Sequence, residues 1–406
     1  FCREYMECAK DKKEAEDMLR IRKTWHVEKK KKSRKPVWIT YDKLYKAGDN
    51  GEYFFRYCCD HHADSVDIYY IIREESPAKE RLTARYGDHI LIFGTLRCLM
   101  TCLLADAVFA THPDIRAQFD PGRRYMDCSK DLFGARIICI QHGLTIQKIA
   151  QYQNRLYDGT GLYLCASPYE IANLSKPEYG YSPDQLKLTG LARYDGLVNN
   201  DQKIILIAPT WRRSITNTGT ANIKKGYNEY FKGSAYFRVY YTLINDRQLI
   251  NTAKESGYRI IFLLHPAMSA QLPDFTGSCY TEILQGSEDI SYEKILCESS
   301  LMVTDYSGIQ FDFAYMRKPV LYYQFDYERF RKGHMESGYY DYHEDGFGPI
   351  CRNSDTLIQQ FYHLAEKGFI IAPEYEERCD NFFYYHDRGY SRRNYEMIMA
   401  IDDQYR

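Results

Sequence analysis

The sequence predicts an α/β protein with two domains of similar size, each built on its own parallel sheet. Short apolar runs rich in β-branched and aromatic residues alternate with longer amphipathic stretches, which is typical of buried parallel strands separated by helices. This alternation pauses in the polar segment 197–202, and a second series of apolar runs follows it. The length of 406 residues also favours two domains, because one domain commonly takes about 100 to 200 residues.

Each apolar run gives one expected strand. In the first domain these runs are 37–40, 66–72, 89–93, 107–110 and 136–140. In the second domain they are 204–208, 258–264, 301–304 and 320–323, with helices expected at 236–253, 309–315 and 354–367. Prolines such as Pro36 and Pro77 fall in the breaks, where elements begin or end. The chain therefore divides into a basic amphipathic N-terminal extension (1–35), a first domain (36–198), a second domain (199–385) and a C-terminal helix (386–406).

Composition excludes several classes of protein. There are 54 Lys plus Arg against 55 Asp plus Glu, a net charge of −1 that argues against a dedicated nucleic-acid binder. With 45% hydrophobic and 27% charged residues, most of the chain is not intrinsically disordered. The longest apolar stretch, 98–110, contains Asp106 and is shorter than the roughly 18 residues of a membrane span, so we expect neither a span nor a secretory signal.

The 13 cysteines are scattered, without a C-x-x-C pair or an evenly spaced framework, and this favours a reducing cytoplasm. One candidate metal cluster is the segment Cys58-Cys59-Asp60-His61-His62. Adjacent residues cannot easily all face one tetrahedral ion, and no second ligand pair follows at a suitable spacing, so a metal there is the weaker interpretation.

The N-terminal extension ends in the basic run Lys29–Lys32, followed by Arg34 and Lys35. Such a run is usually a solvated helix face. The alternative is attraction to anionic lipid, at about 1 kcal/mol per basic residue near the surface, which would hold the protein against the inner face of a membrane. The sequence leaves both interpretations open.

Candidate site residues follow the expected strands, because open parallel sheets bind ligands beyond the carboxyl ends of their strands. In the first domain, strand 136–140 leads into Gln141-His142-Gly143, with Lys148 further along. The second domain offers three such strand ends: Pro209-Thr210-Trp211-Arg212, His265-Pro266 and Asp305-Tyr306-Ser307-Gly308. Each also has an ordinary explanation, since a histidine can be a satisfied polar group, an arginine a surface ion pair, and an aspartate or serine a helix cap.

The segment 301–315 predicts a strand, a turn and a helix, and with them an anion site. The first N–H groups of a helix are unpaired and its dipole is positive there, so the Ser307 hydroxyl and the backbone of the turn suit a phosphate. Arg212 adds a planar guanidinium beside Trp211, an arrangement that phosphate recognition often uses.

Together these motifs resemble the CDP-glycerol glycerophosphotransferase family, which comprises teichoic acid and capsule polymerases and primases. The resemblance runs from about residue 90 to about residue 390 and keeps the family's order of motifs. Further matching segments are 190–195, Phe311-Asp312, Lys318-Pro319, 323–327, 338–342 and 345–349. One position departs from the family pattern, because Gly308 stands where the family usually has a second serine.

The resemblance implies a GT-B fold, with two Rossmann-like domains whose parallel sheets face a central cleft. It also implies transfer of glycerol phosphate, or ribitol phosphate, from a CDP-activated donor to a hydroxyl of a polymer or a lipid-linked primer, with release of CMP. The first domain would hold the acceptor and the second the CDP-alditol. The expected partners are therefore the donor, an anionic polymer or lipid-linked acceptor and the inner face of the cell membrane, with no nucleic acid.

We assign the residues on this basis. His142 is the expected base for the acceptor hydroxyl, and His265 donates to the transferring or departing phosphate. The donor phosphates and nucleotide are assigned to Thr210, Arg212, Asp305, Ser307, Gly308 and Asp312, and the acceptor to Gly143 and Lys148. Within the donor site, Arg212 would hold the pyrophosphate, while Asp305 and Asp312 would orient the turn and the helix start. Because the chain has no D-x-D element, we expect no metal requirement and no cofactor besides the CDP-alditol substrate.

Two rival functions remain. A GT-B glycosyltransferase that uses a nucleotide sugar would share the fold, but it would release a nucleoside diphosphate instead of CMP. A non-catalytic module would bind an anionic polymer through Arg212, Arg213 and the lysines. Such a module would not need a histidine after a strand in each domain.

Overall fold

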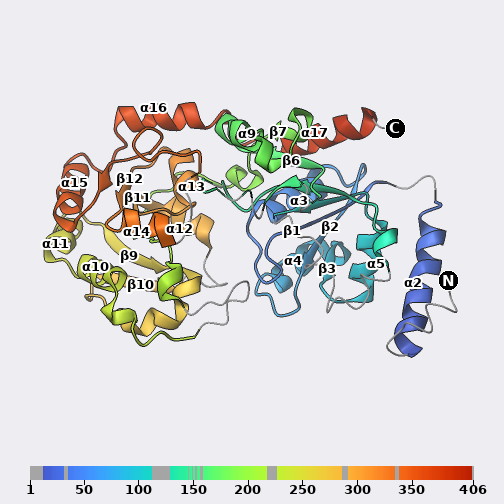
Figure 1. Ribbon diagram of the computed structural model, residues 1–406, viewed down its shortest axis with the longest axis horizontal. Helices are drawn as coiled ribbons and strands as arrows, with labels where there is room; N and C mark the ends of the chain where they lie inside the picture. Colours follow the sequence, from blue (N-terminus) through green and yellow to red (C-terminus); the bar gives the residue numbers. More distant parts are fainter. Residues whose placement is uncertain are drawn as a thin grey trace.

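The computed structural model has two parallel sheets in two α/β domains (Figure 1), as the sequence predicts. It describes residues 12–31, 35–111, 129–144, 146–148, 150, 153–155, 159–216, 226–285, 291–333 and 338–404. The strand order is β3-β2-β1-β4-β5-β6-β7 in the first sheet and β10-β9-β8-β11-β12-β13 in the second. All neighbouring strands run parallel. In both sheets, therefore, the carboxyl ends of the strands share one edge.

The first sheet consists of β1 (Val37–Tyr41), β2 (Asp67–Ile72), β3 (Ile90–Ile92), β4 (Ala107–Ala110), β5 (Arg136–Cys139), β6 (Leu162–Cys165) and β7 (Leu186–Leu188). Its α-helices are α2 (Lys12–Glu28), α3 (Asn50–His61), α4 (Lys79–Tyr86), α5 (Leu96–Leu104) and α9 (Pro168–Leu174). Short 3-10 helices are η1 (Gly87–His89), η2 (Lys130–Leu132), η3 (Pro177–Tyr179), η4 (Pro183–Gln185) and η5 (Ala192–Asp195).

The second sheet consists of β8 (Ile204–Ile207), β9 (Arg259–Leu264), β10 (Thr281–Gln285), β11 (Ser299–Thr304), β12 (Val320–Tyr323) and β13 (Ile350–Cys351). Its α-helices are α10 (Ala235–Ile244), α11 (Arg247–Glu255), α12 (Tyr292–Glu298), α13 (Gln310–Tyr315), α14 (Tyr327–Gly333), α15 (Ser354–Glu366) and α16 (Pro373–Phe382). The 3-10 helices are η6 (Arg213–Ile215), η7 (Phe231–Gly233) and η8 (Pro266–Asp274).

The helix expected at 236–253 is two helices, α10 and α11. Asp246 caps the second helix by accepting a hydrogen bond from the Leu249 N–H at 2.9 Å. A short acidic side chain at this position satisfies a helix start and so stabilises the break. The apolar periodicity continues across the break, and for that reason the sequence pattern alone did not separate the two helices.

The final helix, α17 (Tyr390–Gln404), returns to the first domain, as its position beside α3 shows (Figure 1). Asp195 fixes its start by accepting hydrogen bonds from the N–H groups of Tyr390 and Ser391, at 2.8 and 2.9 Å. Further along, the Tyr395 ring lies 5.7 Å from that of Trp38 in the core of the first sheet. The C-terminal helix therefore belongs to the packing of the first domain.

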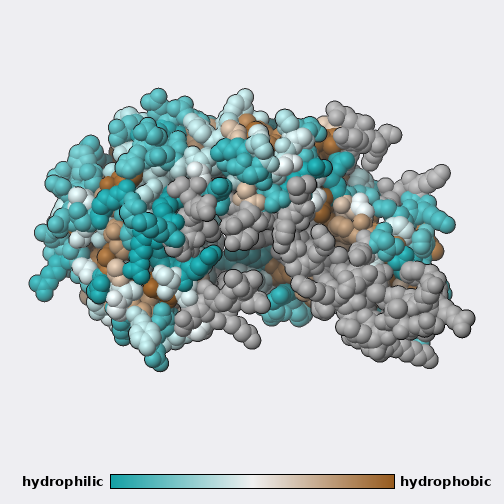
Figure 2. All heavy atoms as spheres, viewed as in Figure 1, coloured by the Kyte–Doolittle hydropathy of each residue, from teal (hydrophilic) through white to brown (hydrophobic). Residues whose placement is uncertain are grey.

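A continuous apolar core joins the two domains. Leu144 and Ile146 of the first domain are buried in the same cluster as Leu206, Met302 and Phe311 of the second. On the face shown in Figure 2, the described outer surface of the second domain is mostly hydrophilic. The apolar residues of the second sheet thus pack inward and toward the first domain.

In the described part of the N-terminal extension, α2 packs on the first domain. Met18 and Ile21 are buried in a cluster with Leu99 and Leu103 of α5, and the Trp25 indole N–H donates to the Leu103 carbonyl at 2.9 Å. Lys32, Ser33 and Arg34 of the basic run lie outside the described residues. None of the helices in the described part of the chain combines the length and the apolar character that crossing a bilayer requires.

Candidate active site

His142 follows β5, in a loop that is held on both sides. The preceding residue, Gln141, has a left-handed backbone conformation with φ 56°, which a residue other than glycine rarely adopts. Its side-chain amide donates to the Leu164 carbonyl at 2.7 Å and to the Glu170 carboxylate at 3.0 Å. The Asn50 amide donates to the Gln141 carbonyl at 2.9 Å. These bonds stabilise a strained turn and fix the position of the backbone from which the His142 side chain extends.

The His142 side chain is accessible to solvent although protein surrounds it. Desolvation by that protein lowers the pKa of the imidazole, and the nearby Asp49 carboxylate opposes the shift. A hydrogen bond to the Thr111 backbone also favours the protonated ring. A neutral imidazole can accept a proton from a hydroxyl near neutral pH, which is what a general base needs.

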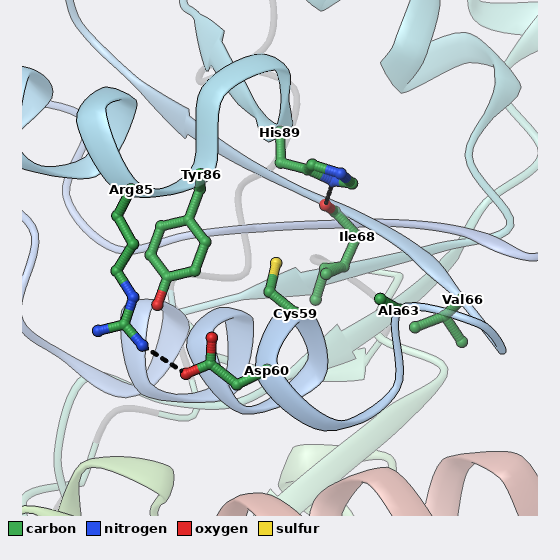
Figure 3. Close-up of a pocket in the computed structure, with 8 residues that line it drawn as sticks. All are labelled: Cys59, Asp60, Ala63, Val66, Ile68, Arg85, Tyr86 and His89. Atoms are coloured by element: carbon green, nitrogen blue, oxygen red, sulfur yellow. Dashed lines mark hydrogen bonds and ion pairs between the residues drawn. The ribbon is translucent and has the colours of Figure 1, made fainter.

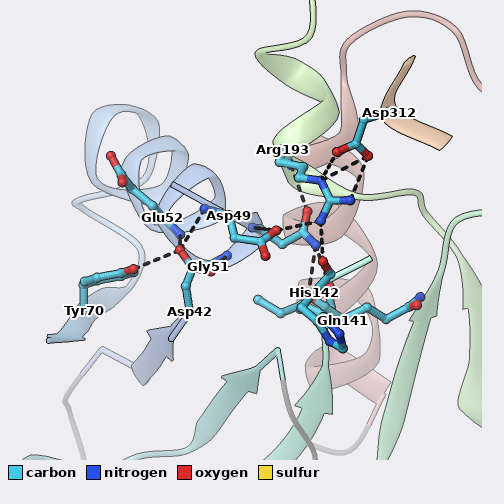
Figure 4. Close-up of polar contacts among 11 residues, drawn as sticks. Asp42, Asp49, Gly51, Glu52, Tyr70, Gln141, His142, Arg193 and Asp312 are labelled. Atoms are coloured by element: carbon cyan, nitrogen blue, oxygen red, sulfur yellow. Dashed lines mark hydrogen bonds and ion pairs between the residues drawn. The ribbon is translucent and has the colours of Figure 1, made fainter. Parts of the chain in front are cut away.

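The start of α3 positions the residues that support this loop (Figure 4). Asp42, directly after β1, accepts hydrogen bonds from the N–H groups of Asp49 and Gly51 at 3.0 and 2.6 Å. A Cβ on Gly51 would lie 2.6 Å from the Asp42 carboxylate and 2.8 Å from the Tyr41 carbonyl, so this close approach requires glycine. Burial, followed by repulsion from Asp49, raises the pKa of Asp42 to about 7.

In the second domain, Asp305 organises the turn that follows β11. Its buried carboxylate accepts a hydrogen bond from the Thr210 N–H at 2.8 Å, which joins the ends of β11 and β8. The turn then presents Ser307, which is half-buried, and Gly308, which is exposed. The Thr210 hydroxyl is buried without a partner among the described residues. Polar groups at two adjacent strand ends are therefore available to a ligand.

Arg212 has a different role from the one the sequence suggested. Its side chain is buried and lies 2.7 Å from Asp305, and it binds Asp326 through two nitrogens at 2.9 and 3.0 Å. The remaining N–H groups donate to the carbonyls of Thr210 and Trp211 at 2.7 and 3.4 Å. All five N–H groups of the guanidinium thus have acceptors within the protein. The prediction that Arg212 contacts the donor phosphate does not fit this arrangement, and Arg212 instead fixes Asp305 and the turn.

His265 follows β9, at the same edge of the second sheet. Its Nδ1 accepts a hydrogen bond from the Ala267 N–H at 3.1 Å and so caps η8. A neutral imidazole that accepts at Nδ1 carries its proton on Nε2, so Nε2 is a hydrogen-bond donor. The ring lies 6.3 Å from that of Trp211, next to Thr210 at the end of β8.

The loop after β5 contacts the second domain directly. A Cβ on Gly308 would lie 3.8 Å from the Leu144 carbonyl oxygen, so the turn of the second domain faces the loop that carries His142. Arg331 of α14 donates to the Gln147 side chain at 2.7 Å. Lys148, at the end of this loop, is exposed. The structure therefore brings the loop that follows β5, at Leu144, next to the predicted donor turn.

A second contact between the domains runs through Arg193 of η5. Its guanidinium donates to Asp312 of α13, with a shortest distance of 2.7 Å, and to the His142 carbonyl, also at 2.7 Å. The carboxylate of Asp312 thus pairs with the first domain and holds α13 against it. Gly143 lies against the same guanidinium, because a Cβ there would be 3.4 Å from an Arg193 nitrogen.

A cavity of about 280 Å³ lies elsewhere in the first domain (Figure 3). It is lined by Cys59, Asp60, Ala63, Val66, Ile68, Arg85, Tyr86 and His89. Val66 and His89 precede β2 and β3, so the cavity lies at the amino ends of the strands, whereas His142 follows the carboxyl end of β5. No group of three or more possible metal ligands occurs in the ranges that the structure describes, and this holds for the segment 58–62 as well.

Sequence reasoning missed Asp42, Asp49, Asn50 and Arg193. The rule that pointed to His142 could have identified Asp42, because Asp42 directly follows a predicted strand. Arg193 lies in the matching segment 190–195, but the sequence does not show that its side chain reaches two domains.

Comparison with known proteins decides the family. The family model described as CDP-Glycerol:Poly(glycerophosphate) glycerophosphotransferase matches residues 21–400. The chain belongs to this family. Membership confirms the resemblance seen in the sequence motifs.

The curated relatives are named as proteins of teichoic acid synthesis. The Minor teichoic acid biosynthesis protein GgaB of Bacillus subtilis (strain 168) is 34% identical over 91% of this chain and 40% of its own length. The Teichoic acid poly(glycerol phosphate) polymerase of the same organism is 27% identical over 46% of this chain and 22% of its own length. The chain therefore spans less than half the length of these relatives.

Among solved structures, the Wall Teichoic Acid Polymerase TagF superposes with a TM-score of 0.63 at 16% identity, covering 98% of this chain and 100% of that one. At this identity the likeness shows the fold. It agrees with the expected GT-B arrangement of two parallel-sheet α/β domains.

Proposed function

We propose that this chain transfers glycerol phosphate, or alternatively ribitol phosphate, from a CDP-activated donor to a hydroxyl of a teichoic-acid-like or capsular polymer or of its lipid-linked primer, releasing CMP. The observation that carries the proposal is the approach of Gly308 to Leu144. It places the loop with the candidate base beside the turn with the candidate phosphate site. Family membership and the teichoic acid relatives support the donor class.

In the proposed reaction, the acceptor oxygen attacks the phosphorus that carries the glycerol. The bond from this phosphorus to the bridging oxygen of the diphosphate breaks, and CMP leaves with that oxygen. His142 takes the proton of the acceptor hydroxyl, and Nε2–H of His265 donates to the phosphate on which charge develops. Phosphoryl transfer requires mainly that the reactants are positioned and that the developing charge is stabilised. In this proposal His142 and His265, which follow strands of the two sheets, serve these two needs.

The phosphate is proposed to lie between the strand ends of the second domain. Ser307 and Gly308 are accessible at these ends, and the Thr210 hydroxyl is buried there without a partner among the described residues. Gly143 and Lys148 line the acceptor side in this proposal. Arg212 and Asp312 act indirectly, because their charged groups pair with other residues.

The test is to incubate the protein with CDP-glycerol or CDP-ribitol and a lipid primer that carries glycerol phosphate, and to measure released CMP. Acceptor-dependent CMP release supports the proposal. Release of UDP from a UDP-sugar would favour the glycosyltransferase, and polymer binding without CMP release would favour the binding module. A parallel reaction with EDTA tests the expectation that no metal is required, because chelation should leave the rate unchanged.

Ser307→Ala should weaken CDP-glycerol binding, because a hydrogen bond to a charged group contributes roughly 1.5 to 3 kcal/mol, or about 10-fold to 150-fold in Kd. Gly308→Ser should be tolerated or improve binding, since a Cβ there meets only the Leu144 carbonyl oxygen at 3.8 Å and the serine restores the family's pattern. Calorimetric titration of both variants with CDP-glycerol measures this. Unaltered affinity in Ser307→Ala would place the phosphate elsewhere.

We also propose peripheral contact with the cytoplasmic face of an anionic membrane, where a lipid-linked acceptor would be found. Deleting residues 1–35 is a poor test, because α2 covers apolar side chains of α5. Replacing Lys30, Lys32, Arg34 and Lys35 by glutamine removes charge without removing α2. Sedimentation with phosphatidylglycerol vesicles should decrease in this variant and also with added salt. Binding that is indifferent to both changes would contradict the electrostatic proposal.

A further inference from the structure

Arg193 contacts both halves of the proposed site (Figure 4). Its Nη1 donates to the Asp49 carboxylate and to the His142 carbonyl, both at 2.7 Å. Nε and Nη2 donate to Asp312 at distances from 2.7 to 3.3 Å. Its backbone N–H donates to the Asn50 side chain at 3.0 Å. One side chain therefore joins the start of α3, the loop after β5 and the helix α13.

Two of these contacts, those with the His142 carbonyl and with Asp312, are close in sequence to the residues of the proposed reaction. The His142 carbonyl belongs to the residue that we assign as the base. Asp312 lies on α13, the helix that directly follows the turn with Ser307 and Gly308. Asp312 and the Arg193 side chain are largely buried, with side-chain exposures of 8% and 12%. A change in this guanidinium would therefore shift the base and the donor turn relative to each other.

We infer that Arg193 is a positioning residue that sets the spacing between His142 and the donor turn, an inference that rests on the proposed function. Transfer requires the acceptor oxygen and the phosphorus to approach to about 3 to 3.5 Å, and a misplacement of about 1 Å can reduce the rate 100-fold. The planar guanidinium is needed because it donates in several fixed directions at once. A lysine keeps the charge, but it cannot reproduce the paired contact with Asp312 together with the contact to the carbonyl.

The test compares Arg193→Lys and Arg193→Ala with Arg22→Ala. Arg22 is a matched control, because it also pairs with an aspartate through two nitrogens, with Asp131 at 2.9 and 2.6 Å, but joins α2 to η2 within the first domain. In both Arg193 variants kcat should fall about 100-fold, while the Kd for CDP-glycerol changes less than about 3-fold. Arg22→Ala should keep its kcat. A kcat in Arg193→Lys equal to that of the wild type would overturn the inference.

Measuring kcat for Asp312→Asn, alone and combined with Arg193→Lys, tests whether Arg193 acts through its contact with Asp312. Asp312→Asn should lower kcat, and adding it to Arg193→Lys should cause little further loss, because Arg193→Lys already breaks the paired contact with Asp312. Additive losses would contradict the inference.

Hydrogen exchange gives an answer that does not depend on activity. In Arg193→Lys, amides of 141–148 and of 305–312 should both exchange faster, with the strands of both sheets unchanged. Faster exchange in only one segment, or throughout the protein, would overturn the inference even if the wild type released no CMP. Absence of CMP release by the wild type, with both segments affected, would instead count against the proposed function.

Discussion

Replacing His142 by alanine should lower the rate of CMP release by about 100-fold to 10,000-fold, which is the usual cost of losing a general base. CDP-glycerol affinity should stay nearly unchanged, because the assigned partner of His142 is the acceptor. The structure adds a reason for the assignment, since the His142 side chain is exposed on a loop that lies beside the turn with Ser307 and Gly308. Steady-state rates and a titration with CDP-glycerol measure the two effects separately.

The pH dependence of the wild type tests the same assignment. Desolvation lowers the pKa of His142, so the imidazole stays neutral, and competent as a base, at pH values below its ordinary pKa of 6.5. Activity should therefore fall with decreasing pH only below 6.5. His363→Ala is the matched control, because His363 is an exposed histidine on α15. An acidic limb at or above pH 6.5, or a His142→Ala variant that is folded and active, would contradict the mechanism.

Replacing His265 by alanine should lower turnover by a similar factor, about 100-fold to 10,000-fold, and should also weaken CDP-glycerol binding by about 10-fold or more. The combined effect follows from the assigned contact between Nε2–H and a phosphate. The same substitution removes the cap of η8, because Nδ1 accepts from the Ala267 N–H. Loss of a cap by itself destabilises a protein by roughly 0.5 to 2 kcal/mol.

His265→Asn separates the two roles. Asparagine is a good helix cap and can accept from the Ala267 N–H, but it has no group equivalent to Nε2–H. We therefore expect His265→Asn to melt near the wild-type temperature and to remain as inactive as His265→Ala. If the asparagine variant regained most of the activity, His265 would be a structural cap and another group would have to stabilise the phosphate.

The strands that could be predicted are those with a pronounced apolar run. β4 and β12 have the predicted bounds because their residues are buried on both faces, and this gives an uninterrupted apolar sequence. β10 is only partly buried and contains Glu282, so it lacks that pattern. β6 was not predicted either, although all four of its residues are apolar and buried, because periodicity alone does not distinguish so short a run from part of a helix. β7 and β13 were also not predicted. β7 includes Lys187, and β13 has two residues, too short for a periodicity to be recognised.

For the site, the sequence indicated which residues lie at the edge of each sheet but not which charges pair there. His142, His265 and Thr210 follow strands as predicted. Arg212 was expected to face a ligand, yet its guanidinium pairs with two carboxylates, those of Asp305 after β11 and Asp326 after β12. Such pairing depends on which strands are neighbours in the sheet, and the order of strands along the chain does not reveal this.

Because α17 completes the core of the first domain, that domain is discontinuous along the chain. Tyr395 and Ile398 share a cluster with Trp38, Phe54 and Phe109, so these early aromatic residues remain incompletely covered until residues 390–404 have been made. Domains commonly fold in the order of synthesis. Here the domain that is translated first acquires its last layer only after the second domain has been made. A ribosome-bound chain would therefore expose an aromatic surface for most of its elongation. Such a chain would need protection from aggregation during that time.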